Sequence, residues 1–594
     1  MHRLDYPFDW KVIHRKRAAI RRQLLASEHN FLEKKIAVLG GSSTEGVVKT
    51  LELFLLKKGI KPTFYESEFG QYWEEIVLQK KALVDFSPDL ILIHTSCENI
   101  KIWPKPSQSD EEVASLVKSE QDRLSQMWSA AAEAFGCPII QNNFELPMTR
   151  QFGNLDSVLA QGKTNYVLQI NKFVSEFAKE EKSFFVNDIN FLSSQLGLQN
   201  WFNEELWATA RYAFDHSVFP DYASNVASIV AAIFGLTKKC LVLDLDNVMW
   251  GGVIGDDGLN GVNIGPDSLV GEGFLSFQRY IKALGERGVV LTVCSKNEDT
   301  NAMEGLAHPD GAVTPSDFSV VRANWDPKSE NIKKIAAELN IGLDSLVFID
   351  DSPFEREQVR MQVQGPSVPE VTKSPSSFIM AIEKNGYFES VSLSVEDIAR
   401  NSIYKTNAQR KIKQKQFSNY DDFLVSLCMK AEISKFKPIY YERITQLINK
   451  TNQFNLTTNR YSVSDIAGFA KDENCLSIYG KLEDKFGDNG LVAVLIGKQC
   501  NDEMVIDTWL MSCRVFNRNL EFAMFNEFVN CVIKKDIRRI RGVFRPTKKN
   551  KPVSSLFQDM GFDRDKDLED GGSEWVLPLE KYKSSDYKIE VIYD

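Results

Sequence analysis

The segment KCLVLDLDNVMWGGVIGDDG at residues 239–258 decides the fold of the central part of the chain. It begins with a short apolar run, typical of a buried strand, and the run ends in two carboxylates, Asp244 and Asp246. Ligands of open α/β sheets lie beyond the carboxyl ends of the strands. Two acidic side chains at that edge are suited to hold Mg²⁺ against a phosphate. The alternative is that they only cap the segment that follows.

Polar side chains also follow the later elements expected in this region. One strand is expected to end at Ser295 and another in Asp350 and Asp351, and Lys328 opens a helix between them. Strands that alternate with helices predict a parallel sheet, whose strands end at one edge. We therefore expect these four residues to converge on Asp244.

This set of groups predicts phosphoryl transfer. Asp244 is expected to attack phosphorus, and Asp246 to protonate the leaving oxygen and then activate water. Ser295 is expected to donate to a phosphoryl oxygen, and Lys328 supplies a fixed positive charge. The expected Mg²⁺ ligands are Asp244, the backbone carbonyl of Asp246, Asp350 and Asp351.

The same residues resemble the four motifs of the haloacid dehalogenase (HAD) superfamily. The motifs are matched in order by residues 244–248, Ser295, Lys328 and residues 350–351. The strings DLDNVMWGGVIGDDG, VCSKN and FIDDSPFEREQVR are similar to the FkbH-like subgroup, HAD subfamily IIIC. The resemblance implies an enzyme that dephosphorylates 1,3-bisphosphoglycerate, a phosphorylated three-carbon acid. It also implies that the glyceryl unit is loaded onto a phosphopantetheinylated acyl carrier protein.

Residues 35–236 predict a first parallel sheet, because strands and helices alternate there. Its turn GGSST at residues 40–44 resembles the first block of SGNH hydrolases. That resemblance implies Ser42 as a nucleophile, Asn99 as an oxyanion donor and His216 as the base.

Two departures weaken the hydrolase interpretation of this first domain. Gly41 replaces the family's aspartate, and Ala213 stands where an aspartate three residues before the histidine is expected. A serine without an oriented base is a weak nucleophile. The alternative is that Ser42 and Thr44 cap the helix that follows, in a domain used for docking.

Beyond residue 391 the pattern changes to α+β, with paired strands expected at 490–496 and 504–510 and a helix at 520–533. The string SCRVFNRN precedes that helix and resembles the pyrophosphate loop of GNAT acyltransferases. The implied coenzyme A or pantetheine contacts are Cys513, Arg514, Asn517, Arg518 and Asn519. Asparagine replaces both loop glycines and obstructs a phosphate, so a pantetheine arm is the expected ligand.

An acyl group on its way to a carrier thiol could pass through an enzyme thioester. Cys294 is next to Ser295, but strand alternation points it away from the phosphate site. Cys513 precedes the loop and the start of a helix, and a helix N-terminus lowers the pKa of a thiol. Cys513 is therefore the preferred carrier, and the alternative is that both cysteines are core residues.

The predicted fold class is α/β: a doubly wound, Rossmann-type HAD-like core, with an SGNH- or flavodoxin-like α/β domain before it and an α+β GNAT-like domain after it. The expected divisions are a helical arm at 1–34, an SGNH-like domain at 35–236, a HAD-like domain at 237–390 and a GNAT-like domain at 391–594. A stand-alone HAD phosphatase acting on a small metabolite remains an alternative function. Another is a biosynthetic scaffold with a pantetheine-binding tail.

The composition excludes several other classes of function. The net charge of −10 argues against a general nucleic-acid binder. No apolar run reaches the roughly 18 residues of a membrane span, so no membrane partner is expected. The nine cysteines form no CxxC pair and are typical of reduced thiols in a cytoplasmic protein.

Overall fold

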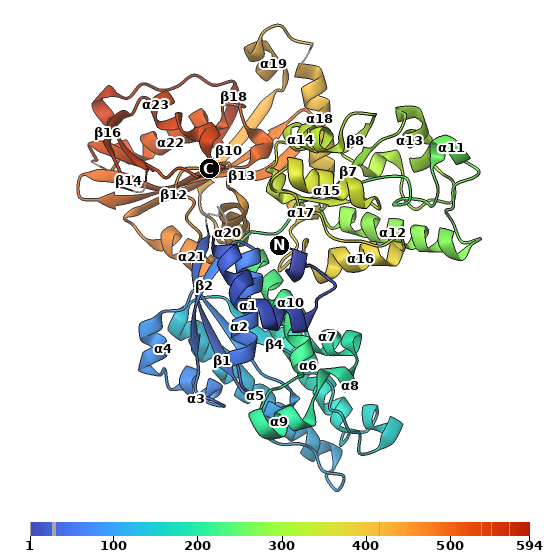
Figure 1. Cartoon of the computed structure of the whole chain (residues 1–594). Coiled ribbons are helices and arrows are strands. Elements are labelled where there is room, and N and C mark those ends of the chain that lie inside the picture. The colour runs from blue at the N-terminus through green and yellow to red at the C-terminus, as the bar shows by residue number, and fades with distance from the viewer. Residues whose placement is uncertain are drawn as a thin grey trace. The chain divides into compact units, whose positions relative to one another are not determined.

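The computed structural model describes residues 2–26, 31–398, 400–414, 416–535, 537–547, 549–569 and 571–593. The chain forms two compact units. The first comprises the residues up to 236 together with 384–391, and the second comprises 237–383 together with the residues from 392 onward. In Figure 1 the first unit is mainly blue to green, and the second is mainly green to red.

The first unit contains a five-stranded parallel sheet in the order β2-β1-β3-β4-β5, the flavodoxin-like order of doubly wound folds. Its strands are β1 (Leu32–Gly40), β2 (Ile60–Glu66), β3 (Leu90–His94), β4 (Ile139–Asn142) and β5 (Phe184–Asn187). The strand pattern is the expected one, with β5 as an addition that the sequence did not predict. The predicted helical arm to residue 34 is wrong in its extent, because the helix ends at Leu25 and β1 begins at Leu32.

Helices cover both faces of this sheet. Successive side chains of β1 point to opposite faces, so they enter two different core clusters. Ile36 and Val38 pack in one core cluster, and Ala37 and Leu39 pack in another. The helices of the first face are α1 (Trp10–Leu25), α2 (Glu45–Lys57) and α10 (Phe219–Ile233). Those of the second are α3 (Tyr72–Val77), α5 (Asp110–Phe135) and α6 (Lys163–Glu180).

The second unit begins with a four-stranded parallel sheet in the order β8-β7-β6-β9. Its strands are β6 (Cys240–Leu243), β7 (Val290–Ser295), β8 (Val320–Ala323) and β9 (Leu346–Ile349). Its helices are α12 (Leu269–Glu286), α13 (Asp299–Leu306), α14 (Lys328–Leu339), α15 (Pro353–Gln362) and α16 (Pro375–Lys384). Because β6 lies between β7 and β9, the carboxyl ends of these three strands are neighbours.

A larger sheet follows in the second unit, in the order β16-β17-β15-β14-β13-β12-β10-β18. Its first strand is β16 (Asp563–Asp567), and the short β11 (Phe454–Asn455) pairs with β14. The expected antiparallel pair is confirmed as β13 (Gly487–Cys500) with β14 (Glu503–Met511). Its other strands include β10 (Met429–Lys435), β12 (Cys475–Asp484), β15 (Arg539–Phe544), β17 (Ser573–Pro578) and β18 (Ile589–Tyr593). Side chains of α22 (Leu520–Ile533) pack on one face, and those of α20 (Tyr441–Lys450) and α21 (Val463–Lys471) on the other.

The predicted fold class is confirmed. Each unit contains a parallel sheet of the α/β type, and the second unit also contains the larger sheet of the α+β domain. Within the described part of the chain, no helix combines the length and the apolar content that crossing a membrane requires.

Candidate metal centre

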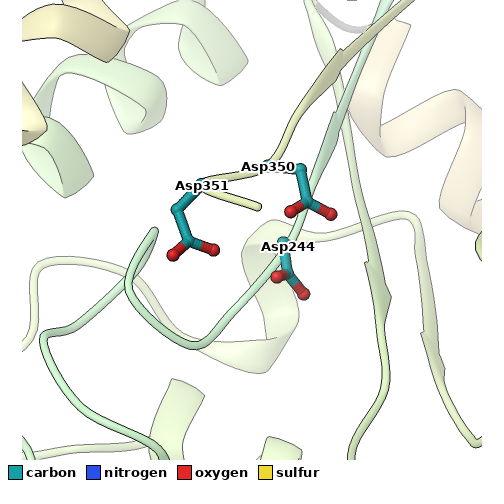
Figure 2. Close-up of side chains that lie close together, drawn as sticks. All are labelled: Asp244, Asp350 and Asp351. Carbon is teal, nitrogen blue, oxygen red and sulfur yellow. The ribbon is translucent and has the colours of Figure 1, made fainter. Parts of the chain in front are cut away.

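Three carboxylates meet at the carboxyl edge of the β6–β9 pair. Asp244 follows β6, and Asp350 and Asp351 follow β9, whose residue Ile349 is opposite Leu243. One oxygen from each carboxylate lies within 4.8 Å of the others. Figure 2 shows the three side chains close together at the ends of their strands. The convergence that the sequence predicts for these residues is present in the structure.

Lys328, the first residue of α14, bridges two of the carboxylates. Its Nζ lies 2.9 Å from Asp244 Oδ2 and 2.6 Å from Asp350 Oδ2, and all three side chains are buried. Burial lowers the pKa of Lys328, but the two carboxylates outweigh burial and hold that pKa above its usual value. The lysine therefore stays protonated and supplies the fixed positive charge that the sequence predicts.

One positive charge does not satisfy the three carboxylates. Asp244 Oδ1 is buried and has no hydrogen-bond donor, which is costly for a carboxylate oxygen. Burial, with the Asp244 charge next in importance, raises the pKa of Asp350 to about 7. The same two causes raise the pKa of Asp351. A buried set of carboxylate oxygens with excess negative charge fits Mg²⁺, a hard cation that prefers oxygen ligands.

Asp246 is held by three donors outside this cluster. Its Oδ1 accepts hydrogen bonds from Trp250 Nε1 at 2.9 Å and from the backbone N–H of Ile254 at 3.1 Å. Its Oδ2 accepts one from Asn297 Nδ2 at 2.8 Å. The side chain is not one of the three clustered carboxylates. The carboxyl of Asp246 therefore stands apart from the clustered carboxylates, and its roles in metal binding and proton transfer stay predictions.

Ser295 ends β7 and is buried, and its Oγ accepts a weak hydrogen bond from Asn297 Nδ2 at 3.4 Å. Sequence reasoning gave Asn297 no role, although its place two residues after Ser295 was a usable signal. Cys294 packs in the core cluster of this sheet with Cys240 and Val242, as strand alternation predicts. Burial raises the pKa of the Cys294 thiol to about 12.

The first unit presents a different set of groups at its sheet edge. Ser42 Oγ is buried and has no hydrogen-bond partner among the described residues, so it is not bonded to His216, which begins a 3₁₀ turn. Asn99 Nδ2 donates to the backbone oxygen of Gly41 at 2.8 Å. The expected helix cap is wrong in detail: Thr44 occupies the cap position of α2, but its hydroxyl donates to Glu66 at 2.6 Å.

The predicted GNAT-type loop is tied to its own domain. Arg518 donates to buried Asp484 at 3.0 Å and to Asn407 at 2.9 Å. Asn517 and Asn519 both adopt left-handed backbone, with φ of 59° and 64°. Asparagine thus adopts, at both positions where the motif has glycine, the left-handed backbone that glycine adopts most readily.

Cys513 is partly exposed and begins a three-residue 3₁₀ turn, Cys513–Val515. The helix α22 begins only at Leu520, so the expectation that a helix N-terminus acts on this thiol is wrong. The neighbours of the thiol are side chains and not a helix N-terminus. Tyr404 OH lies 4.0 Å from Cys513 Sγ, and Arg514 is the next residue in the turn.

Comparisons with known proteins show what the chain is similar to. A family model described as "FkbH, N-terminal domain" matches residues 35–231. The matched span lies within the first unit. A crystal structure of the N-terminal part of the protein BF1531 from Bacteroides fragilis is 27% identical, with a TM-score of 0.58. The match covers 64% of this chain and 99% of that one, which contains a phosphatase domain complexed with Mg.

Acetyltransferase structures match a smaller share of the chain. The ribosomal-protein-S18-alanine N-acetyltransferase from Escherichia coli is 14% identical, and the match covers 26% of this chain and 99% of that one. The GNAT domain of S. lividans PAT is also 14% identical, over 25% of this chain and 89% of that one. Both have a TM-score of 0.21. No curated protein matches the chain.

Proposed function

We propose that the metal centre performs Mg²⁺-dependent phosphoryl transfer of the HAD type, with Asp244 as the nucleophile. The observation that carries the proposal is Asp244 itself. One of its oxygens is held by Lys328, and the other is buried without a partner beside Asp350. The BF1531 fragment, which is 27% identical to this chain, contains a phosphatase domain complexed with Mg.

The residues divide the work of phosphate release between them. Bound Mg²⁺ would neutralise the charge of the carboxylates and of the phosphoryl group. Lys328 holds Asp244 and adds a positive charge, and Ser295 donates to a phosphoryl oxygen. Asp244 attacks phosphorus and becomes an aspartyl phosphate. Asp246, fixed by its three donors, protonates the leaving oxygen and then accepts a proton from the attacking water.

The finer proposal is that the substrate is 1,3-bisphosphoglycerate and that Asp244 removes the phosphoryl group of its ester. The phosphopantetheine thiol of an acyl carrier protein then loses its proton, attacks the acyl-phosphate carbonyl and displaces inorganic phosphate, so that the glyceryl unit becomes a thioester. The support for this proposal is the similarity to FkbH-like sequences and the FkbH family match over residues 35–231. The α+β domain, with Cys513 and the residues Arg514, Asn517, Arg518 and Asn519 in one loop, would receive the pantetheine arm.

The test uses the full chain with Mg²⁺, bisphosphoglycerate and candidate carrier proteins. We expect phosphate release together with a carrier mass increased by one glyceryl unit. The Asp244→Asn variant should lose phosphate release by about 10³-fold or more. Asp326→Asn, which removes an exposed carboxylate of the same unit, is the matched control and should behave as the wild type.

The outcomes separate the two levels of the proposal. Phosphate release without any change in carrier mass would leave a phosphatase and overturn glyceryl transfer. Product formation that survives Asp244→Asn would overturn the catalytic role of the metal centre and favour a scaffold.

A further inference from the structure

Five basic side chains gather in the second unit, away from the residues of the metal centre. They are Lys239, which precedes β6, Arg400 at the start of α18 (Arg400–Gln414), Arg443 and Lys450 on α20, and Arg514 in the Cys513 turn. Lys239 Nζ donates to the backbone oxygen of Lys450 at 3.2 Å, which joins the edge of the parallel sheet to α20. We call these five residues the basic cluster.

Few carboxylates balance the basic cluster among the side chains that the structure describes. Asp397 pairs with Arg400 and lies 3.5 Å from Lys450 Nζ, and it also accepts a hydrogen bond from Gln446 at 2.5 Å. Asp344 acts on Lys239, but it is also paired with Lys549. Among the side chains that the structure describes, Lys239, Arg400, Lys450 and Arg514 thus outnumber these two carboxylates.

This excess charge is buried enough to be costly. Burial lowers the pKa of Lys450 well below its usual value, and Arg400 and Arg443 lower it further. Burial, with Arg514 next in importance, lowers the pKa of Arg400 to about 10. Like charges held together at partly buried positions call for an anion that neutralises them.

Arg514 shows where such an anion could bind. Its Nε donates to Ser512 Oγ at 3.2 Å, whereas its Nη1 is buried and has no hydrogen-bond partner in the part of the chain that the structure describes. An unpaired guanidinium N–H in a buried position costs free energy, and a phosphate oxygen is the partner that suits its geometry.

The Cys513 thiol lies beside the same charges. Lys239 and Arg400 both interact electrostatically with Cys513. The turn itself is fixed from the other domain, because Asn340 Nδ2, at the end of α14, donates to the backbone oxygen of Cys513 at 2.9 Å. The thiol and the basic cluster thus share one local environment within the second unit.

We infer that the basic cluster is a binding site for a phosphate-bearing ligand, and that the bound phosphate lies next to the Cys513 thiol. The arginines offer paired N–H donors and the lysines add point charges, as phosphate recognition requires. The site shares no residue with the metal centre, where carboxylates would repel an anion in the absence of Mg²⁺. The phosphate could belong to a free metabolite or to a pantetheine arm, and the two sources are separated by the choice of probe.

The first experiment measures alkylation of the native full chain by iodoacetamide, followed by peptide mass spectrometry. It is done in EDTA at constant ionic strength, with increasing inorganic pyrophosphate or 4′-phosphopantetheine. We expect either probe to slow alkylation of Cys513 saturably, because a phosphate bound next to the thiol blocks the approach of the reagent. The exposed thiols of Cys428 and Cys500 are internal controls and should react at unchanged rates. The probe that saturates at the lower concentration identifies the source of the phosphate.

The second experiment measures pyrophosphate affinity by titration calorimetry. The double variant Lys450→Met, Arg514→Met should bind at least about tenfold more weakly, the loss expected for charge-assisted hydrogen bonds. Lys430→Met, which removes an exposed lysine on β10, is the control and should bind as the wild type. The inference is overturned if neither probe gives saturable protection of Cys513. It is also overturned if the double variant binds pyrophosphate as tightly as the control.

Discussion

The two parallel sheets of this chain have the same kind of architecture and opposite chemistry at their carboxyl edges. In the second unit, the edge gathers Asp244, Asp350 and Asp351 around Lys328. In the first unit, the edge gathers hydroxyls, amides and a histidine. The difference shows that the fold provides the position of a site, whereas the residues at the strand ends decide what it can do.

Burial shifts two titratable groups at the edge of the first unit toward their neutral forms. Burial lowers the pKa of His94 to about 4, and its Nδ1 lies 2.8 Å from Tyr222 OH. Burial raises the pKa of Glu145 to about 7, and Glu145 Oε1 has no partner. Neither His94 nor Glu145 supplies a fixed positive charge like that of Lys328 at the other edge.

Lys328 supplies the fixed positive charge that distinguishes the carboxyl edge of the second unit, and replacing it should have the largest effect of the changes considered. We expect Lys328→Met to lower phosphate release by about 10²- to 10³-fold, because a fixed charge at the reacting group is lost. In EDTA the free energy of unfolding should fall by about 3 kcal/mol, because two buried carboxylates lose their partner. Mg²⁺ should restore part of that stability in the variant. Denaturant titrations with and without Mg²⁺ measure the difference, and an unchanged stability would contradict the bridging role of Lys328.

Replacing Asn297 tests whether the proton-transfer group is positioned from the neighbouring strand. Asn297→Ala should lower kcat by about 10- to 100-fold with little change in KM, because Asp246 loses the donor to its Oδ2. Asn297→Asp should be more damaging, since a second carboxylate would repel Asp246. Steady-state kinetics of both variants provide the measurement. Equal rates for Asn297→Ala and the wild type would show that Asn297 does not position Asp246 for catalysis.

Replacing Glu145 tests the neutral character of the first edge. A carboxyl whose pKa is about 7 when folded and near 4.5 when unfolded binds protons more tightly in the folded state. Its contribution to stability is therefore present below about pH 4.5 and is lost as the pH rises to 7. Glu145→Gln should stabilise the first unit at pH 8 by up to about 3 kcal/mol and have little effect at pH 4.5. Urea titrations at both pH values decide the matter, and a destabilised variant at pH 8 would show that the charged form is preferred.

Replacing Ser42 should have the smallest effect. Ser42→Ala is expected to leave phosphate release and the hydrolysis of a small test ester within about twofold of wild type, because no base is bonded to its hydroxyl. A loss of ester hydrolysis confined to this variant would restore the hydrolase interpretation of the first unit.

Much of the metal centre was predictable from short segments of sequence. Asp244, Ser295, Lys328 and Asp350 each stand at the end of an apolar strand or the start of a helix, and parallel topology then brings them together. Asn297 was missed because its place two residues after Ser295 indicates only that it lies near the site, whereas its hydrogen bond to Asp246 depends on packing between β6 and β7.

The basic cluster could not be predicted in the same way. Lys239, Arg400, Lys450 and Arg514 come from segments far apart in the sequence, and only packing in the second unit places them together. The short strands β5 and β8 were missed because only the first and last of their four residues are buried, whereas all four residues of β6 and of β9 are buried.

The most direct test of the central claim is chemical trapping of the phosphorylated enzyme. Borohydride reduces an aspartyl phosphate to homoserine, and peptide mass spectrometry locates the altered residue. With substrate and Mg²⁺, the phosphoaspartate mechanism predicts homoserine at Asp244 and at no other residue. The Asp326→Asn control should give the same result. Phosphate release without any trapped residue at Asp244, or with trapping at another carboxylate, would contradict it.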